Sequence, residues 1–167
     1  MDRPTFVYVT YIRSAPEQLW QALTDGELTR RYWFGRRVRS DWRVGSRVAF
    51  FAADGRLTDS GQVFECERPR RLSYSWTVEF IEELRREPPS RVTFELEGMT
   101  DVVKLTLTHG QFGASESALK GVSNGWPIIL SSLKSMLETG EPLGVTSAEA
   151  AKRAEEEAIA RMREHAA

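Results

Sequence analysis

The residue types that most often carry out chemistry are scarce in this sequence. Its 167 residues include one cysteine, Cys66, and two histidines, His109 and His165. A single thiol forms no internal disulfide, and with two histidines it supplies too few soft ligands for a zinc or iron-sulfur site. We therefore predict no metal site and no bound cofactor.

Acid-base and nucleophilic chemistry also have few candidates. His109, Tyr74 and an inward-facing Glu65 are the side chains that could move a proton inside the domain. Cys66 has neither histidine near it in the sequence, so we interpret it as a small buried apolar residue. No H-E-x-x-H, G-x-S-x-G, P-loop or dinucleotide-binding pattern occurs. We predict no catalytic residues, and a binding module rather than an enzyme.

Alternating apolar and polar residues predict the strands that would position these side chains. Residues 5–13 (TFVYVTYIR) predict a first strand, and two short helices should follow it, the second beginning after Asp25. Further on, short β-rich runs are separated by turn residues, and Asp54-Gly55 indicates a hairpin because both residues tolerate positive φ. We predict a curved antiparallel sheet of six or seven strands.

One long helix is expected to complete the domain. Its apolar residues recur at helical spacing over residues 126–138, with Pro127 in the first turn, and residues 111–117 before it are expected to form a loop. Residues 144–167 are rich in alanine and charge and predict a further helix with little apolar surface to bury. We therefore divide the chain into a domain at residues 1–143 and a helical tail at residues 144–167.

Composition restricts the partners and the compartment. Hydrophobic residues make up 41% of the chain, enough for a core, and the formal net charge of -1 provides no overall field to attract nucleic acid. The start of the sequence lacks the pattern of a signal peptide, and no apolar stretch reaches the roughly 20 residues needed to cross a bilayer. We expect a cytoplasmic protein without nucleic-acid or membrane partners.

Several segments occur together in the order typical of one superfamily. The chain resembles the SRPBCC superfamily, the START-like or birch-pollen-allergen-like proteins, and within it the branch of heat-shock protein 90 ATPase activator homologues. The resemblance spans about residues 5–143 and rests on the following segments: Ile12-Arg13-Ser14-Ala15-Pro16-Glu17, Leu19-Trp20-Gln21-Ala22-Leu23-Thr24, Gly61-Gln62-Val63, Pro69-Arg70-Arg71-Leu72, Leu105-Thr106-Leu107-Thr108-His109 and Gly125-Trp126-Pro127.

The resemblance implies an α+β helix-grip fold, in which the sheet wraps around the long helix and leaves a cavity between them. Side chains that share a strand face with apolar neighbours, or that face the sheet from the helix, should line this cavity. We predict a ligand site at six residues: Tyr74, Trp76, Phe94, His109, Trp126 and Leu130. The tyrosine hydroxyl, the indole N–H and the imidazole would be its few polar groups.

Three functions remain open on this basis. The first is binding of a small hydrophobic or aromatic ligand in the cavity, with His109 as its polar anchor. The second is a protein-interaction or co-chaperone-like role on a heat-shock protein 90 type ATPase, with a protein partner or a second copy of the chain. For that role a basic cluster could form the docking face, consisting of Arg30, Arg31, Arg36, Arg37 and Arg39. The third is a START-like cyclase or hydrolase.

Overall fold

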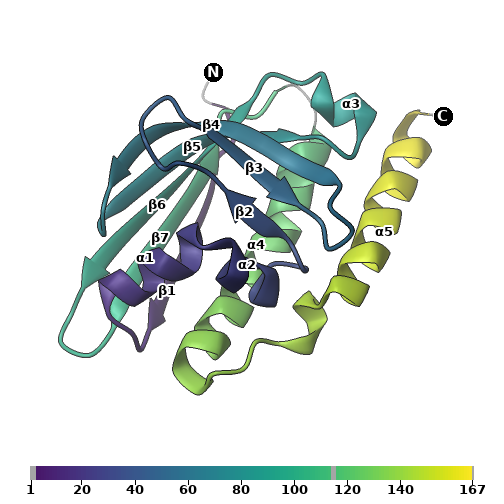
Figure 1. Cartoon of the computed structure of the whole chain (residues 1–167). Helices are drawn as coiled ribbons and strands as arrows, with labels where there is room; N and C mark the ends of the chain where they lie inside the picture. The colour runs from purple at the N-terminus through teal and green to yellow at the C-terminus, as the bar shows by residue number, and fades with distance from the viewer. Residues whose placement is uncertain (1–2, 114–115, 167) are drawn as a thin grey trace.

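The computed structural model describes residues 3–113 and 116–166 (Figure 1). The remaining positions lie outside the described residues, and two of them fall in the loop predicted at residues 111–117. In chain order the elements are β1 (Phe6–Ile12), α1 (Pro16–Thr24), α2 (Gly26–Tyr32), β2 (Arg37–Arg39), β3 (Arg47–Phe51), β4 (Leu57–Glu67), β5 (Arg71–Val78), α3 (Glu82–Arg85), β6 (Ser90–Gly98), β7 (Val103–Gly110), α4 (Glu116–Thr139), the short 3-10 helix η1 (Gly144–Thr146) and α5 (Ala148–Ala166).

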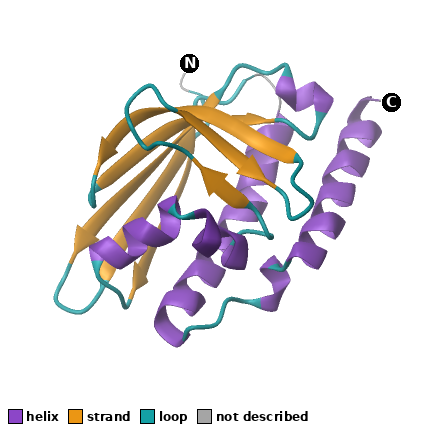
Figure 2. Ribbon diagram, viewed as in Figure 1, coloured by secondary structure: helices purple, strands orange, loops and turns teal. Residues whose placement is uncertain are grey.

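The strands form one curved antiparallel sheet, and α4 crosses its concave face (Figure 2). The strand order is β1-β7-β6-β5-β4-β3-β2, so that the two edge strands are the first two in the chain. The helices α1 and α2 lie between these edges. The prediction of an α+β helix-grip fold with six or seven strands is confirmed.

The sheet separates an apolar face from a polar one because side chains alternate along each strand. In β7 the inward residues Val103, Leu105, Leu107 and His109 are buried, while the residues between them are partly exposed. The buried side chains of α4 lie on the stripe from Trp126 to Met136 and pack against the inward-facing side chains of the sheet. The core therefore lies between the sheet and α4.

The long helix begins earlier than the sequence predicts. α4 starts at Glu116 rather than at Trp126, and Pro127 lies in its interior. A proline ring removes one backbone hydrogen bond and ordinarily ends or kinks a helix. Here the helix continues on both sides because Trp126 is fixed in the core, where it is 2% exposed. Tertiary packing thus overrides the local signal.

Two short elements also escaped prediction. β2 has three residues and α3 has four, which is too short for a periodic pattern to be visible. β2 is held by its neighbours, since the backbone N–H of Val38 donates to the Thr29 hydroxyl and the strand pairs with β3. This contact covers the outer side of an edge strand with α2.

The C-terminal segment is helical, as expected. Thr146 is buried in η1 and its hydroxyl is hydrogen-bonded to that of Ser132, while the Ser147 hydroxyl accepts the backbone N–H of Ala150 at the start of α5. None of the described α5 residues is buried, and a bidentate ion pair between Arg56 and Glu155 ties α5 to the β3–β4 hairpin. Within the described ranges no helix combines the length and apolar character needed to cross a bilayer.

Gly61 in β4 allows the close approach of β5. A β-carbon at this position would lie 1.7 Å from the carbonyl oxygen of Ser75, which is a backbone atom and cannot rotate away. We predict that Gly61→Ala forces the two strands apart and lowers the free energy of unfolding by about 3 kcal/mol. Urea denaturation measures the change.

The matched control is Gly121→Ala on the exposed side of α4, where an added β-carbon meets no atom within 4 Å. This substitution should raise the free energy of unfolding by about 0.5–1 kcal/mol, because alanine favours the helix. Equal effects of the two substitutions would contradict the assigned packing of β4 against β5.

Candidate functional site

The six predicted ligand-site residues come together in the space between the sheet and α4. Tyr74 and Trp76 lie on β5, Phe94 on β6 and His109 on β7, while Trp126 and Leu130 face them from α4. All are buried, and none is more than 8% exposed. The strand parity that selected the four strand residues agrees with their burial, and the role of all six as ligand contacts stays a prediction.

The cavity expected between these residues is filled by side chains. The sequence reasoning missed Trp33 and Phe50, whose rings lie 4.8 Å apart in the centre of the core. Trp33 also stacks parallel to Trp76 at 6.1 Å and meets Trp126 edge-on at 5.2 Å. The aromatic segment at residues 32–34 was a signal for Trp33, but only the fold places that ring over β5.

A chain of hydrogen bonds connects α4 to three strands. The indole N–H of Trp126 donates to Nδ1 of His109 (3.0 Å), and Nε2 of the imidazole lies 2.7 Å from the Ser90 hydroxyl. Because an indole only donates, Nδ1 must be the acceptor and Nε2 must carry the proton. The Ser90 hydroxyl then donates to the carbonyl oxygen of Trp76 (3.3 Å).

This environment keeps His109 neutral. Burial lowers the pKa of the imidazole to about 3, because no carboxylate compensates the charged form. The Phe112 ring stacks on the imidazole at 4.7 Å and covers it. With both nitrogens engaged, the ring has no free donor or acceptor for a ligand or a proton transfer in this arrangement.

Tyr74 differs from the other polar groups of the core. Its hydroxyl is the one buried side-chain polar atom of the described residues that has no hydrogen-bond partner. The neighbouring buried tyrosine, Tyr32, donates to the carbonyl oxygen of Ala22 at 2.7 Å. Burial raises the pKa of Tyr74 well above its usual value, with smaller contributions from Tyr32 and Asp59, so the phenol remains a hydrogen-bond donor.

Two hollows lie at different ends of this core. A small cavity of about 30 Å³ adjoins Trp76, Ser90 and Phe112 beneath α3 and the first turns of α4. This volume corresponds to about one water molecule. A larger open groove of about 670 Å³ lies over β2 and β3, and its lining residues are Thr24, Val38, Arg39, Ser40, Asp41, Arg47, Ala49, Phe51 and Leu57.

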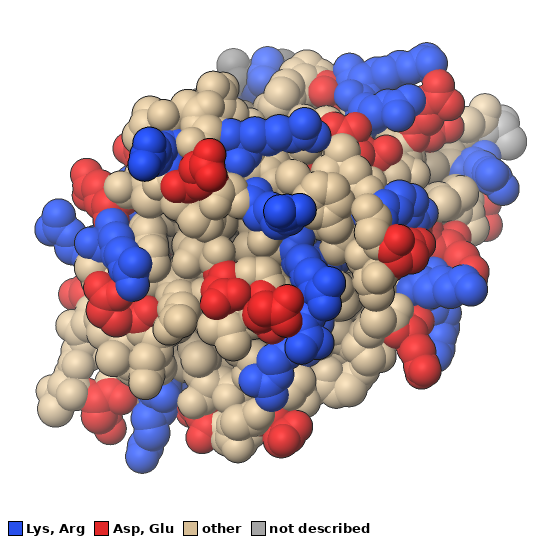
Figure 3. Space-filling view, viewed as in Figure 1, with Lys and Arg blue, Asp and Glu red and all other residues tan. Residues whose placement is uncertain are grey.

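The basic cluster predicted from the sequence is mostly engaged within the molecule. Figure 3 shows basic and acidic side chains interleaved over the centre of the face that carries α2 and β2. Arg30 and Arg37 both pair with Glu27, whose pKa is lowered chiefly by the Arg30 hydrogen bond. Arg31 donates to the carbonyl oxygen of Gly140. Arg30, Arg31 and Arg37 therefore lie at the surface, with guanidinium groups that have partners within the molecule.

Arg36 makes a buried ion pair with Asp59. The Arg36 Nη1 to Asp59 Oδ2 distance is 3.0 Å, and the Asp59 side chain is 2% exposed. Burial raises the pKa of this carboxyl and outweighs the lowering by Arg36. The guanidinium also lies over the Phe80 ring at 5.4 Å. Removing either partner would leave a buried charge unpaired, so the pair is structural.

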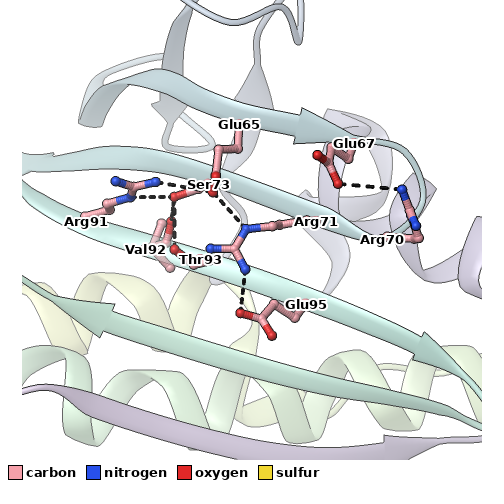
Figure 4. Close-up of polar contacts among 9 residues, drawn as sticks. All are labelled: Glu65, Glu67, Arg70, Arg71, Ser73, Arg91, Val92, Thr93 and Glu95. Carbon is pink, nitrogen blue, oxygen red and sulfur yellow. Dashed lines mark hydrogen bonds and ion pairs between the residues drawn. The ribbon is translucent and has the colours of Figure 1, made fainter.

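Glu65 faces the convex side of the sheet rather than the interior. A β-bulge between Val63 and Glu65 reverses the alternation, and Glu65 pairs with Arg71 (2.8 Å) and Arg91 (3.2 Å) (Figure 4). These contacts lower the pKa of Glu65, and the hydrogen bond from Arg71 has the largest effect. The prediction that Glu65 faces inward is therefore wrong, because the bulge adds one residue to the strand and reverses the face on which Glu65 lies.

The remaining reactive types give no site of their own. Cys66 is half-buried and packs against the core, and burial raises the pKa of its thiol, which makes it a poor nucleophile. The described residues contain no group of three His, Cys, Asp or Glu side chains that could hold a metal ion.

Comparison with known proteins gives one family and many similar folds. The family model for Activator of Hsp90 ATPase homolog 1-like protein matches residues 13–138. A comparison with curated proteins gave no match.

Three solved structures illustrate the similarity. CalU16 from Micromonospora echinospora is 26% identical, with a TM-score of 0.67 over 93% of this chain and 83% of that one. PFC0360w, an HSP90 activator from Plasmodium falciparum, is 26% identical, with a TM-score of 0.66 over 83% and 97%. The Aha1 dimer from Colwellia psychrerythraea, 20% identical, shares the fold with a TM-score of 0.66 over 82% and 98%. The CalU16 match is longer than residues 1–143, so it includes part of the C-terminal segment.

The neutral, buried His109 predicts a pH dependence of stability. The unfolded state binds a proton near pH 6.5, whereas the folded state does so only near pH 3. Stability should therefore fall as the pH is lowered through this window, by up to about 1.4 kcal/mol per pH unit from this group. Urea denaturation of the wild type and His109→Gln between these pH values measures the difference.

The wild-type profile should be steeper than that of His109→Gln, while His165→Gln on exposed α5 should follow the wild type. Parallel profiles for the wild type and His109→Gln, or an imidazole that titrates near pH 6.5 by NMR, would show that His109 is accessible to protons.

Proposed function

Because the chain belongs to the family of Activator of Hsp90 ATPase homolog 1-like proteins, we propose that it uses the interior of its helix-grip fold to bind a small apolar or aromatic molecule. The observation that carries the proposal is the unpartnered hydroxyl of Tyr74 in an aromatic interior. A ligand with one hydrogen-bond acceptor would satisfy this donor and stack on the rings around it.

The surroundings of Tyr74 support an aromatic ligand. Its ring has four aromatic neighbours with centroid distances of 6.1–6.3 Å, namely Trp42, Phe50, Trp76 and Phe94. Such a surface favours planar apolar molecules. Leaving a buried hydroxyl unpaired costs about 1–3 kcal/mol, which a bound acceptor would recover. Since rings now occupy the space, a ligand has to displace at least one of them.

An enzymatic role has weaker support than binding. A cyclase or hydrolase of this fold would need an acid or a base in the interior. Glu65 faces outward, both nitrogens of His109 are engaged, and Cys66 has a raised pKa. Among the predicted candidates, Tyr74 alone retains a free polar atom, and its raised pKa suits donation of a hydrogen bond better than abstraction of a proton.

Activation of a heat-shock protein 90 type ATPase is the second candidate function. It is favoured by the family match and by the similarity to the Plasmodium falciparum activator. The internal pairing of the basic cluster speaks against a docking face built on those arginines. We therefore place this role, and a protein partner or homodimer, behind ligand binding.

A thermal-shift measurement tests ligand binding. We expect 2-acetonaphthone, a naphthalene with one ketone, to raise the melting temperature, by about 5–10 °C at 100 times its dissociation constant. The matched probe 2-isopropenylnaphthalene, in which a CH₂ group replaces the ketone oxygen, should bind at least about tenfold more weakly because Tyr74 has nothing to donate to. Absence of a shift with either probe, and with fatty acids and flavones, would overturn the proposal.

Tyrosine-to-phenylalanine substitutions test the anchor. Tyr74→Phe removes an unsatisfied hydroxyl, so the free protein should become more stable by about 1 kcal/mol while the preference for the ketone disappears. Tyr32→Phe is the control, since it removes a satisfied hydroxyl and should destabilise the protein by about 1 kcal/mol without changing that preference. A Tyr74→Phe variant that keeps the full preference for the ketone would exclude Tyr74 as the anchor.

An ATPase assay with the organism's own heat-shock protein 90 decides the second candidate. We expect no stimulation by the wild type. Stimulation that is lost in Arg30→Glu/Arg37→Glu would instead favour the co-chaperone role. Arg36 is not used in this test, because reversing its charge would disrupt the buried pair with Asp59.

A further inference from the structure

The groove over β2 and β3 is lined by both charged and apolar side chains. Arg39 and Arg47 lie in it, both exposed, and the part of the chain that the structure describes gives neither an ion pair. Asp41 is the acidic residue of the lining, so the groove carries a net charge of about +1 from two cations and one anion. The apolar lining residues are Val38, Ala49, Phe51 and Leu57.

These two arginines differ from their neighbours on the same face. Arg30 and Arg37 are held by Glu27, and Arg36 is held by Asp59. Their guanidinium groups are therefore occupied. Arg39 and Arg47 remain available for an anion from outside, such as a carboxylate or a phosphate.

Trp42 connects this groove to the interior. Its backbone N–H donates to the Ser40 hydroxyl and its indole N–H to the carbonyl oxygen of Thr24, both at 3.0 Å, and these two residues line the groove. Its ring also contacts that of Tyr74, with the centroids 6.1 Å apart and the ring planes tilted by 54°. Trp42 thus contacts two residues of the groove lining and also the ring of Tyr74, whose hydroxyl has no partner.

The position of Trp42 is suited to exchange with a ligand ring. The residue is only half-buried, and its φ of 55° lies in the left-handed region, which is unfavourable for a bulky side chain. The other four tryptophans, Trp20, Trp33, Trp76 and Trp126, are all buried in the core. Trp42 is therefore the aromatic neighbour of Tyr74 that can leave with the smallest loss of packing.

We propose that the groove is the outer half of the ligand site and that the ligand is an amphipathic anion. Its apolar or aromatic part replaces the Trp42 ring beside Tyr74, and its carboxylate or phosphate lies between Arg39 and Arg47 in the groove. This inference rests on the proposed function, because it needs the interior to accept a ligand. It adds the route of entry, the charge of the ligand and the residues that recognise that charge.

A charged probe and its neutral ester test the anion site. The probes are 4-(2-naphthoyl)butanoate, which joins a naphthyl ketone to a carboxylate, and its methyl ester. We expect the acid to bind the wild type about tenfold more tightly than the ester at low ionic strength, and this difference to shrink at about 0.5 M salt. The double variant Arg39→Glu/Arg47→Glu should lose the preference for the acid and keep its affinity for the ester.

The matched control is Arg43→Glu/Arg85→Glu, which makes the same change in net charge at two exposed arginines outside the groove. It should retain the preference for the acid. If both double variants weaken the acid equally, the effect is long-range and the groove is not the site. If acid and ester bind the wild type equally, the proposed recognition of an anion is wrong.

Trp42→Gly tests the route of entry. Glycine tolerates the positive φ and removes the ring, so the ketone probe should associate at least about threefold faster with the variant than with the wild type. Its melting temperature without a ligand shows whether it is folded, and Trp42→Phe provides a second variant that keeps a smaller ring. Unchanged association rates in both would overturn the role of Trp42.

The two proposals fail in different ways. Binding of 2-acetonaphthone without any preference for the acid over the ester would overturn the anion site and leave the interior site intact. Failure of every probe, neutral or charged, to bind the wild type would overturn both.

Discussion

The hydrogen bond from the Trp126 indole to His109 is the contact on which the rest of the interior depends. It is buried, and it continues through Ser90 to the backbone of Trp76, so that one chain of donors and acceptors joins α4 to β7, β6 and β5. Each polar group in this chain has a partner, which allows it to lie in an apolar core without a large desolvation cost. The orientation of α4, and hence of the rings it presents to the sheet, follows from this connection.

The two ends of the core differ in whether their buried polar groups have hydrogen-bond partners. The small cavity near Ser90 adjoins groups that already have partners, whereas Tyr74, farther along the same face of β5, has none. The aromatic rings between the two ends contact one another and fill the interior. The hydroxyl of Tyr74 nevertheless lacks a hydrogen-bond partner there. A site for a ligand is therefore better supported at the Tyr74 end, where Trp42 is the least buried of the aromatic neighbours.

Among the described residues, the charged side chains of the surface also divide into those with partners within the molecule and those without. On the convex face, Glu65, Arg71 and Arg91 form a connected network, and around α2 the arginines pair with Glu27 and with buried Asp59. The exposed pairs among these contribute little to stability, about 0–1 kcal/mol each, but like the buried pair of Arg36 with Asp59 they occupy the guanidinium groups. A chain with almost balanced charge can therefore still present a local basic groove, because pairing is decided by position rather than by composition.

The sequence by itself determined the longer strands, the hairpin at Asp54-Gly55, the family and the inward-facing residues of β5, β6 and β7. These features depend on local alternation and turn chemistry, which are present in any short window of sequence. Only the tertiary structure decided that α4 extends back through Pro127, that Trp33 fills the expected cavity and that Glu65 faces outward after a bulge. Each of these depends on contacts between residues far apart in the chain, where packing energy exceeds the local preferences that a sequence pattern records.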